Sequence, residues 1–451
     1  MAPAAAPPLP PGPRTRVPGG DLLAFRRDPL GMLERLARDH GDVAGMRFGP
    51  RRVTLLTDPE LVREVLVTRH RSFIKSYALQ RARVLLGEGL LTSEEPLHLR
   101  QRRLAQPAFH RERIAAYAAD MTAYAARMAE EEWRDGETLD VAREMNRLTL
   151  AIAGKTLFGA EVAGEAEEIA GALTTALGLY RRLTNPLGPL LDRLPTPGTL
   201  RMRRARARLD ATIYRIIAER RRGGGDRGDL LSMLLLAQDT EGDGGGMTDL
   251  QLRDEALTIF LAWHETTANA LAWTWLLLAR NPGAEAALHG ELDRVLGGRL
   301  PGVDDLPALP YTRAVLAEAM RVFPPAYVVG RQPLHDMEIG GFRVEEGSIV
   351  LMSPWVIQRD PRWWPDPLRF DPGRWTPQME AELPKFAYFP FGGGPRKCIG
   401  EGFAWTEQVL VLATLAARWR VKPVAGHPVA TEPMITLRPK HGIRAALERR
   451  R

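Results

Sequence analysis

The stretch FPFGGGPRKCIGEGFAWTEQVLVLATLAARW, residues 389–419, decides the fold of this chain. Three glycines and a proline before Cys398 predict a tight loop, and the apolar run that follows predicts a helix from about Cys398 to Trp419. A thiol at the start of a helix meets free backbone N–H groups and the positive end of the helix dipole, which lower its pKa. The stretch therefore predicts a cysteine poised as a thiolate, the form that binds metal. The alternative is an inert structural thiol, the usual role of a lone buried cysteine.

Five residues of this stretch fit the pattern FxxGxRxCxG, namely Phe391, Gly394, Arg396, Cys398 and Gly400. A chance match in an ordinary chain of this length has odds on the order of 10^-4 or lower. With this motif and those below, the sequence resembles the cytochrome P450 family along nearly its whole length. The resemblance implies that Cys398 is the axial ligand of haem iron, that Phe391 shields its sulfur and that Gly400 leaves room for the haem plane. A thiolate ligand pushes electron density onto the iron and favours O–O cleavage.

The fold class that we expect is mainly α with small β-sheets, the cytochrome P450 fold with a long central helix over the haem. Gly49-Pro50 predicts a hairpin, residues 72–97 a loop region, and residues 337–357 short strands. The longest helical pattern begins at Thr248, which forms a capping box with Gln251, and stops at Asn281-Pro282-Gly283. Residues 1–18 predict a disordered Pro-rich tail, and residues 19–451 a single catalytic domain.

The middle of the long helix reads AWHETT and resembles the oxygen-activation site of the family. Ala262 and Thr266 are four residues apart, so both can face the haem. The resemblance implies that Glu265 and Thr266 form an acid–alcohol pair that delivers protons to bound oxygen. The alternative is that Thr266 caps a local kink, because Thr can bond its own helix backbone, and that Glu265 is paired at the solvent. Trp263 stands where the family usually has glycine, and we expect it to pack away from the haem.

Glu318 and Arg321 form an ExxR element, and Arg374 lies in FDPGRW. The resemblance implies that these three residues form a buried structural network that holds the cysteine loop. Haem carries two propionates, and the family binds them with cations at four positions that match His98, Arg102, Arg331 and Arg396. Arginine suits carboxylates through its planar fork. Any one of these four side chains could instead be an ordinary surface cation.

By resemblance, the substrate pocket is mostly apolar, which suits a fatty acid, a terpenoid or a polyketide-like molecule. Its predicted walls are Leu86, Leu257, Phe260, Leu261, Ala326, Tyr327, Val328, Met434 and Ile435. The alternative is that several of these are core residues. The stretch around GLLT and RQRRLAQPAFHRERI resembles the branch with fatty-acid hydroxylases, which favours long-chain lipids slightly. Arg181 or Arg182 could hold a substrate carboxylate.

The bulk composition narrows the partners and the compartment. The formal net charge is +7, which would suit an acidic redox partner, and no nucleic-acid motif accompanies it, so we expect no nucleic-acid partner. A single cysteine excludes an internal disulfide and fits a reducing compartment. The sequence has no apolar run long enough to span a membrane. We therefore expect a cytoplasmic monomer.

The resemblance implies a monooxygenase that inserts one oxygen atom from O2 into a hydrophobic small molecule. Because the chain has no Rossmann fingerprint and no cysteine cluster, electrons from NAD(P)H must arrive through an external reductase and a ferredoxin or flavodoxin. Three alternatives stay open: a peroxide-driven peroxygenase or decarboxylase, a non-enzymatic haem sensor or carrier, and a basic nucleic-acid-binding protein without haem.

Overall fold

The computed structural model describes residues 6–13, 19–159, 194–242 and 244–450. It groups into two compact units, each assembled from segments far apart in the chain. Unit 1 comprises Met1–Arg81, Arg321–Arg369 and Thr376–Cys398. Unit 2 comprises Ala82–Met320, Phe370–Trp375 and Ile399–Arg451. The disordered tail and the single domain that the sequence predicts stay predictions.

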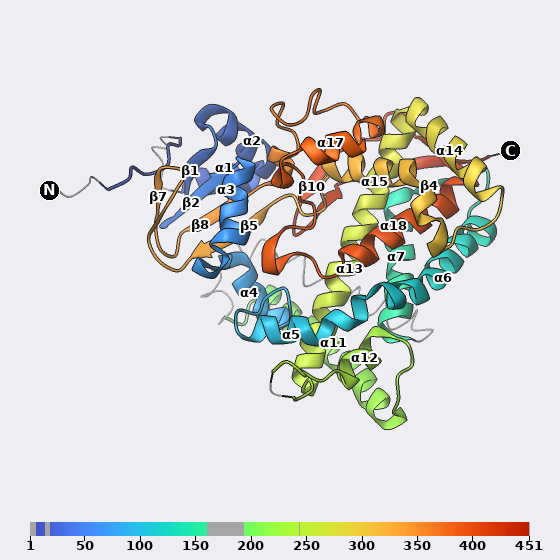
Figure 1. The fold of residues 1–451 in the computed structure, drawn as a ribbon, viewed down its shortest axis with the longest axis horizontal. Coiled ribbons are helices and arrows are strands. Elements are labelled where there is room, and N and C mark those ends of the chain that lie inside the picture. Colours follow the sequence, from blue (N-terminus) through green and yellow to red (C-terminus); the bar gives the residue numbers. More distant parts are fainter. Residues whose placement is uncertain (1–5, 14–18, 160–193, 243, 451) are drawn as a thin grey trace. The chain divides into compact units, whose positions relative to one another are not determined.

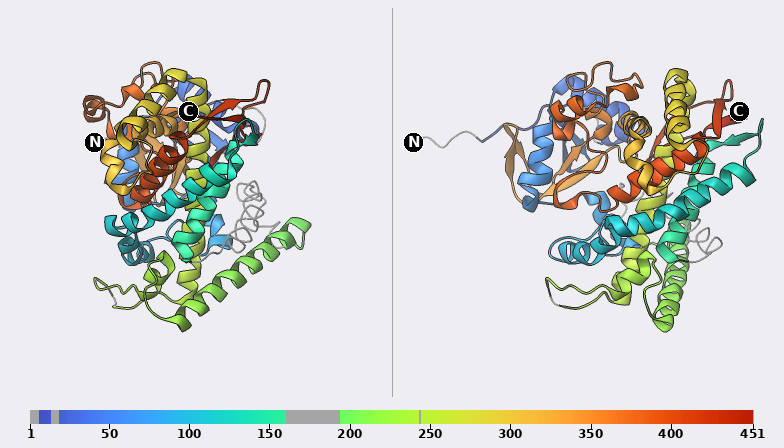
Figure 2. Two further views of the ribbon diagram at one scale, coloured as in Figure 1. Left: turned by 90° about the vertical axis from the view of Figure 1, so that its right-hand side faces the viewer. Right: turned by 45° about the vertical axis from the view of Figure 1, so that its right-hand side comes forward.

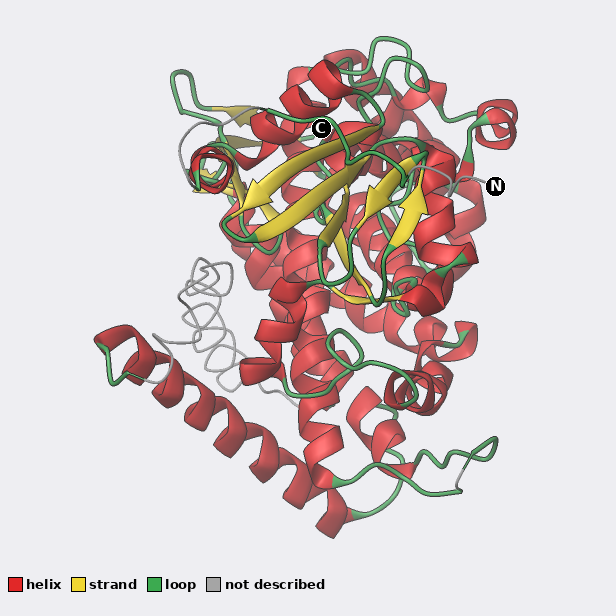
Figure 3. Cartoon of the chain, turned by 90° about the vertical axis from the view of Figure 1, so that its left-hand side faces the viewer, coloured by secondary structure: helices red, strands yellow, loops and turns green. Residues whose placement is uncertain are grey.

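Unit 1 is built around a five-stranded sheet in the order β1-β2-β8-β5-β3, whose strands are among the yellow arrows of Figure 3. The hairpin predicted at Gly49-Pro50 is confirmed, because β1 and β2 pair antiparallel on either side of it. β8 runs parallel to β2 and antiparallel to β5. A separate two-stranded sheet pairs β6 with β7. The strands of this unit are β1 (Val43–Phe48), β2 (Arg51–Leu56), β3 (Phe73–Lys75), β5 (Val329–Pro333), β6 (Met337–Ile339), β7 (Phe342–Val344) and β8 (Ile349–Met352).

The core of unit 1 joins this sheet to the segment that leads to the cysteine. Val350 and Met352 of β8, both fully buried, belong to the same hydrophobic cluster as Phe386 and Phe389. The chain therefore enters the cysteine loop from an anchored position. The helical elements of this unit are α1 (Gly20–Arg27), α2 (Pro29–His40), α3 (Pro59–Arg63), η1 (Glu64–Thr68), η2 (His70–Ser72), α16 (Pro354–Ile357), α17 (Pro377–Glu382), η7 (Lys385–Ala387) and η8 (Gly394–Arg396).

Part of the proline-rich start has fixed partners in unit 1. The carbonyl of Pro11 accepts a hydrogen bond from the amide of Gly45 in β1, and the carbonyl of Pro8 accepts one from the amide of Arg343 in β7. These residues run without helix or strand of their own. The remaining residues of the predicted tail, 1–5 and 14–18, lie outside the described residues.

Unit 2 is mostly helical, and its central element is α13 (Asp249–Arg280), 32 residues and about 48 Å long. The predicted helix start is confirmed, because the side chain of Thr248 accepts from the amide of Gln251 and the side chain of Gln251 accepts from the amide of Thr248. The predicted stop is also confirmed, with Asn281 as the C-cap. α13 packs along α7 (Val141–Phe158), and both are labelled in Figure 1.

The other helices of unit 2 surround this pair. Helix α11 (Pro197–Gly223), the long green helix of Figure 2, contains the arginine-rich residues 201–222. No helix in the part of the chain that the structure describes is long and apolar enough to cross a membrane. The remaining helical elements are α5 (Leu97–Ala105), η3 (Gln106–Phe109), α6 (Arg111–Arg127), η4 (Met128–Glu132), α12 (Leu230–Leu236), α14 (Pro282–Leu296), η5 (Val303–Ala308), η6 (Pro372–Arg374) and α18 (Glu401–Ala416).

Two small sheets complete unit 2. The first has the order β4-β12-β9, with strands β4 (Thr138–Asp140), β9 (Trp419–Pro423) and β12 (Arg444–Arg449). The second is the pair β10 (Thr431–Pro433) and β11 (Leu437–Pro439), joined by a turn of three residues. The expected fold class, mainly α with small sheets, is confirmed.

Two local predictions were wrong. Residues 72–97 are not all loop, because α4 (Tyr77–Leu86) forms there and buries Ala82, Leu85 and Leu86 on one face. Arg81 and Arg83 on either side of Ala82 obscured the helical period of the apolar residues in the sequence. The helix expected from about Cys398 begins three residues later, at Glu401, with Gly400 as its N-cap. Helix α15 (Pro310–Val322) carries the ExxR element across the boundary between the units.

Candidate active site

Backbone contacts within unit 1 fix the loop that ends at Cys398. The amide of Cys398 donates to the carbonyl oxygen of Phe391 at 3.0 Å, and the amide of Lys397 donates to that of Gly394 at 3.0 Å. The Cys398 side chain is exposed. A structural cysteine would be buried and inert, so this exposure favours the reactive, ligating role of the thiol.

Close packing explains why the loop needs glycines. A Cβ atom on Gly394 would lie 1.9 Å from the carbonyl oxygen of Leu66 in η1, and Gly394 has a φ of +67°. A Cβ atom on Gly393 would lie 2.4 Å from the ring of Phe386. Real Cβ atoms do not approach this closely, because packed interiors leave no such overlap. The loop therefore rests directly on η1 and on the core of unit 1.

Arg321 and Gln358 tie this core to the segment before the loop. Arg321 is fully buried and donates from Nη1 to the carbonyl oxygens of Gln358 at 2.8 Å and Pro367 at 2.7 Å. The buried amide of Gln358 donates from Nε2 to the carbonyl of Arg321 at 3.2 Å and accepts from the amide of Phe389 at 3.2 Å. No sequence motif assigns Gln358 a role. It is a structural partner of Arg321 and of the chain two residues before Phe391.

In unit 2, Glu318 pairs with Arg374. The Nε atom of Arg374 donates to Glu318 Oε1 at 3.0 Å, and the indole of Trp375 donates to Glu318 Oε2 at 3.0 Å. The backbone amide of Asp371 also donates to Glu318, which is fully buried. A buried carboxylate with three donors is well compensated. The arrangement supports a structural role for Glu318 and Arg374, as the resemblance implies.

The middle turn of α13 has one open face. Between Leu252 and Leu278 every residue of the helix is buried except Ala262, which is exposed, and Thr266, which is half-buried. These two residues are four apart and share a face. The Thr266 hydroxyl donates to the carbonyl oxygen of Ala262 at 2.7 Å, the backbone contact foreseen by the alternative interpretation of Thr266. With its own proton used in this way, the hydroxyl oxygen keeps lone pairs that can accept a proton donor on the open face.

Glu265, next to Thr266, is directed to a different element. Its Oε1 accepts from the hydroxyl of Thr436 at 2.7 Å, and Thr436 Oγ1 accepts from Asn269 Nδ2 at 3.1 Å. Glu265, Thr436 and Asn269 are 8%, 5% and 7% exposed. Thr436 lies in the turn between β10 and β11, beside the predicted pocket residues Met434 and Ile435. The sequence contains no signal for this contact, since 171 residues separate its two ends.

Trp263 packs against α18 and not on the open face of Ala262. Its ring meets Phe403 with centroids 3.6 Å apart, and its indole N–H donates to Glu407 Oε2 at 2.9 Å. Glu407 is fully buried, and burial raises its pKa from 4.5 to about 8, against the opposing effect of hydrogen bonds from Trp263 and Thr267. Glu407 was missed from the sequence, although a lone carboxyl inside an apolar helix is an available signal.

Two further carboxyl groups of α13 hold the loop after α4. Asp254 Oδ2 accepts from the amide of Glu88 at 2.8 Å, and Glu255 Oε2 accepts from the amide of Leu90 at 3.1 Å. Burial raises the pKa of Glu255 to about 8. This loop follows Leu86 directly, so α13 positions that part of the predicted pocket wall.

The predicted propionate ligands fall in both units. His98 and Arg102 lie one turn apart on α5 in unit 2, and His98 Nδ1 is 3.1 Å from Glu95 Oε1. Arg331 lies on β5 and Arg396 in η8, both in unit 1 and both half-buried. A propionate role for these four residues stays a prediction.

The predicted pocket residues divide into two groups. Phe260 and Leu257 are fully buried, and Phe260 packs on Phe158 of α7 with ring centroids 5.9 Å apart. Both point about 140–160° around α13 from Ala262, away from its open face, and their burial is what the alternative interpretation as core residues foresees. The other buried residues are Leu86, Leu261 and Tyr327, and the partly exposed ones are Ala326, Val328, Met434 and Ile435. Arg181 and Arg182 lie outside the described residues.

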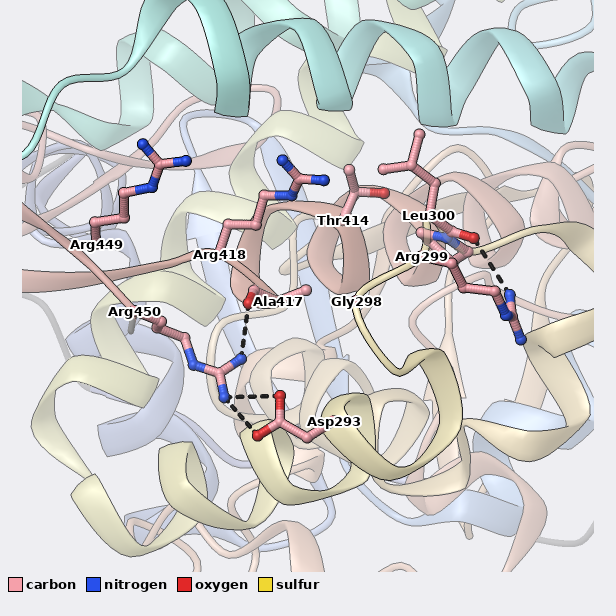
Figure 4. A pocket seen from close by; sticks show the side chains of 10 residues that line it. Asp293, Gly298, Arg299, Leu300, Thr414, Ala417, Arg418, Arg449 and Arg450 are labelled. Atoms are coloured by element: carbon pink, nitrogen blue, oxygen red, sulfur yellow. Dashed lines mark hydrogen bonds and ion pairs between the residues drawn. The ribbon is translucent and has the colours of Figure 1, made fainter.

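A basic surface pocket of about 280 Å³ lies in unit 2 and contains none of the predicted site residues (Figure 4). Three of its four arginines are held by carboxylates: Arg450 Nη2 contacts Asp293 at 2.8 Å, Arg418 contacts Glu130 at 2.6 Å and Arg299 contacts Asp305. These pairs largely neutralise the pocket, which we do not assign to the active site.

The chemistry of the accessible residues described above fits haem. Unit 1 presents an exposed thiol on a rigid loop, and half-buried arginines for carboxylates lie on the same unit. Unit 2 contributes a buried helix that is open at a small residue and a hydroxyl. A single protein thiolate suits an iron whose other ligands are supplied by a macrocycle and not by the protein.

Comparisons with known proteins agree with this chemistry. The cytochrome P450 family profile matches residues 10–444. Cyclooctatin synthase of Streptomyces melanosporofaciens is 45% identical over 424 residues, which are 93% of this chain and 91% of the relative. Cyclooctat-9-en-7-ol 5-monooxygenase of the same organism is 41% identical and covers 94% and 93%. Pentalenene oxygenase of Streptomyces avermitilis is 39% identical and covers 89% of each chain.

A solved structure extends the agreement to the fold. The haem domain of cytochrome P450DA superposes with a TM-score of 0.88 at 27% identity, covering 99% of both chains. The profile match and the identities over most of the chain settle the family, and the enzyme class follows from it. This protein belongs to the cytochrome P450 family of monooxygenases.

Proposed function

We propose that this enzyme binds haem b through Cys398 and hydroxylates a cyclic terpenoid, with electrons from separate redox proteins. The observation that carries the proposal is the open face of α13: a helix otherwise buried over its middle presents Ala262 and Thr266. When bound, the haem supplies O2 activation and oxygen transfer to a C–H bond.

The residues of the chain have separate tasks in this proposal. Cys398 binds the iron, and Arg331, Arg396, His98 and Arg102 neutralise the propionates. Ala262 leaves space beside the helix. The Thr266 hydroxyl donates its own proton to the Ala262 carbonyl oxygen. Its oxygen therefore accepts a hydrogen bond from a proton donor on the open face and holds that donor in place. Glu265 supplies protons to it.

Three relatives support a terpenoid over the fatty acid that the sequence favours slightly. Cyclooctat-9-en-7-ol 5-monooxygenase and pentalenene oxygenase are named for cyclic terpene substrates, and they are 41% and 39% identical to this chain. Cyclooctatin synthase, at 45% identity, bears the name of its product. The partly exposed apolar side chains of Met434 and Ile435 in unit 2 suit contact with a rigid hydrocarbon.

Electrons would come from NAD(P)H through an external reductase and a ferredoxin or flavodoxin. The chain carries 62 Lys and Arg against 55 Asp and Glu, which favours an acidic carrier. The monomeric state and the cytoplasmic location stay predictions.

The test is a spectral titration of the ferric holoenzyme with matched sets of cyclic di- and sesquiterpenes, their alcohols, and C12–C18 fatty acids. We expect the terpenes to shift the Soret band, and turnover with a ferredoxin pair under 18O2 to place one labelled atom in the product. Shifts with fatty acids alone would overturn the substrate class. Product with hydrogen peroxide and none with a reductase pair would overturn the electron route in favour of a peroxygenase.

A further inference from the structure

The turn between β10 and β11 holds the carboxylate that the proposed function uses as its proton source. Within unit 2, Thr436 donates to Glu265 Oε1 at 2.7 Å and is itself held by Asn269 Nδ2 at 3.1 Å. All three side chains are less than 9% exposed. Since Asn269 is four residues after Glu265, one face of α13 supplies both ends of this chain of hydrogen bonds.

In the structure the acid and the alcohol of the predicted pair have different partners. Thr266 Oγ1 donates to the carbonyl oxygens of Ala262 at 2.7 Å and Trp263 at 3.2 Å. The adjacent side chain of Glu265 projects about 100° around the helix, where Thr436 meets it. The relay is therefore not assembled in this state, and the contact that keeps Glu265 apart comes from a turn outside the helix.

The turn that carries Thr436 also carries two predicted substrate contacts. Met434 and Ile435 are partly exposed, whereas Thr436 is buried. The turn is tight, because the amide of Met434 donates to the carbonyl of Thr436 at 3.1 Å. Because this hydrogen bond closes the turn of Met434, Ile435 and Thr436, a displacement of Met434 or Ile435 also displaces Thr436.

We infer that Thr436 is a positioning residue that holds the Glu265 carboxylate on the β10–β11 turn and so links proton delivery to the loop that contacts substrate. Substrate that moves the turn carries the Glu265 carboxylate, still held by Thr436, toward Thr266, and loss of the Thr436 hydroxyl breaks this link. The inference rests on the proposed function, because it takes Glu265 as the proton source and Met434 and Ile435 as substrate contacts.

The test compares the holoenzyme with Thr436→Val, which removes the hydroxyl at nearly constant volume, and with Thr436→Ser, which keeps it. We expect Thr436→Val to lower the product formed per NADPH by roughly threefold to tenfold, the change in a population ratio that one hydrogen bond brings, with peroxide rising in proportion. Thr436→Ser should recover most of the coupling. The spectral dissociation constant of the substrate should stay within about twofold, since the proton donor does not bind substrate.

Thr274→Val is the matched control. Thr274 is a fully buried threonine of the same helix, nine residues after Glu265, whose hydroxyl donates to the carbonyl of Ala270 at 2.7 Å. It should leave the coupling unchanged. Asn269→Leu removes the hydrogen bond that Asn269 donates to Thr436 and leaves Thr436 itself unchanged. It should lower the product formed per NADPH, as Thr436→Val does.

Amide hydrogen exchange gives a readout independent of turnover. In the substrate-free holoenzyme, Thr436→Val should raise exchange in residues 431–439 several-fold, and Thr274→Val should not. Normal coupling and exchange in Thr436→Val, together with uncoupling in Glu265→Gln, would overturn the inference and leave the proposed function standing. A Glu265→Gln variant with normal coupling would instead remove Glu265 from the proposed function itself.

Discussion

The loop that ends at Cys398 and the middle turn of α13 are both marked by short motifs, but different interactions hold them. The loop is fixed by its own backbone, through the Cys398–Phe391 hydrogen bond and the close approach of Gly394 to Leu66. The turn is regular helix, and its character comes from side chains that reach other elements, Trp263 to Glu407 and Glu265 to Thr436. The difference predicts that the loop tolerates almost no change, whereas the turn can be altered one contact at a time.

The largest effect is expected on the loop side, from Cys398→Ala. Without the thiolate, the reduced, CO-treated protein should lose the thiolate-type Soret band completely, and monooxygenase activity with it, because no other side chain can supply the ligand. Absorption spectroscopy of the purified variant checks this. A retained thiolate-type band in Cys398→Ala would break the assignment of the ligand.

Gly394→Ala should have the second-largest effect, because it disturbs the backbone conformation of the loop. The added Cβ would overlap the Leu66 carbonyl at a positive φ, so we expect a loss of at least about 3 kcal/mol in the free energy of unfolding and poor haem retention. The control is Gly392→Ala, at a φ of +70° with no atom within 4 Å of the new Cβ. It should cost about 1–2 kcal/mol. Equal losses in urea denaturation would show that packing on η1 contributes nothing.

On the α13 side, Thr266→Ala should uncouple the enzyme and leave it folded. Removing the hydroxyl on the open face should lower product per NADPH by about tenfold or more, while peroxide accumulates. Thr266→Ser should restore much of the coupling. Simultaneous assays of NADPH, peroxide and product measure the coupling. Unchanged coupling in Thr266→Ala would remove the proposed role in proton delivery and leave only the backbone hydrogen bond as a role for Thr266.

Trp263→Phe tests a single side-chain contact of the turn. An aromatic but smaller ring remains and the N–H donor to Glu407 is lost, so the free energy of unfolding should fall by about 1–2 kcal/mol more than in a control that loses ring volume alone. Trp275→Phe is the matched control on the same helix, because the buried indole N–H of Trp275 has no hydrogen-bond partner among the described residues. If both variants lose the same amount, ring volume and not the hydrogen bond explains the loss.

The last prediction concerns the pH dependence of stability. Burial raises the pKa of Glu407 to about 8, so its contribution is fully present below the ordinary value of 4.5 and is lost as pH rises toward 8. Glu407→Gln removes that titration and keeps an acceptor for Trp263. The Tm of the parent should therefore fall relative to the variant between about pH 5 and 8. Parallel Tm curves over this range, measured by circular dichroism, would contradict the shifted pKa.

The same comparison explains what could be predicted from the sequence. The cysteine loop, the caps of α13 and the β1–β2 hairpin depend on residues close in the chain, so their motifs could be read directly. Glu318 and Arg374 were found through motif order. Glu407, Gln358 and Thr436 act through partners 31 to 171 residues away, and local patterns carry no information on such contacts. The packing of Phe260 on Phe158 could not be predicted, because helical period alone does not say which face of α13 is buried against α7.

One consequence of the proline-rich start reaches beyond the active site. β1 is an edge strand of the five-stranded sheet, and Pro11 occupies its free amide at Gly45. Proline has no N–H to offer, so a segment that accepts from the edge ends the ladder instead of extending it. Trimming residues 1–13 for expression would bare that edge and invite chains to aggregate through it, so solubility tags belong ahead of an intact N-terminus.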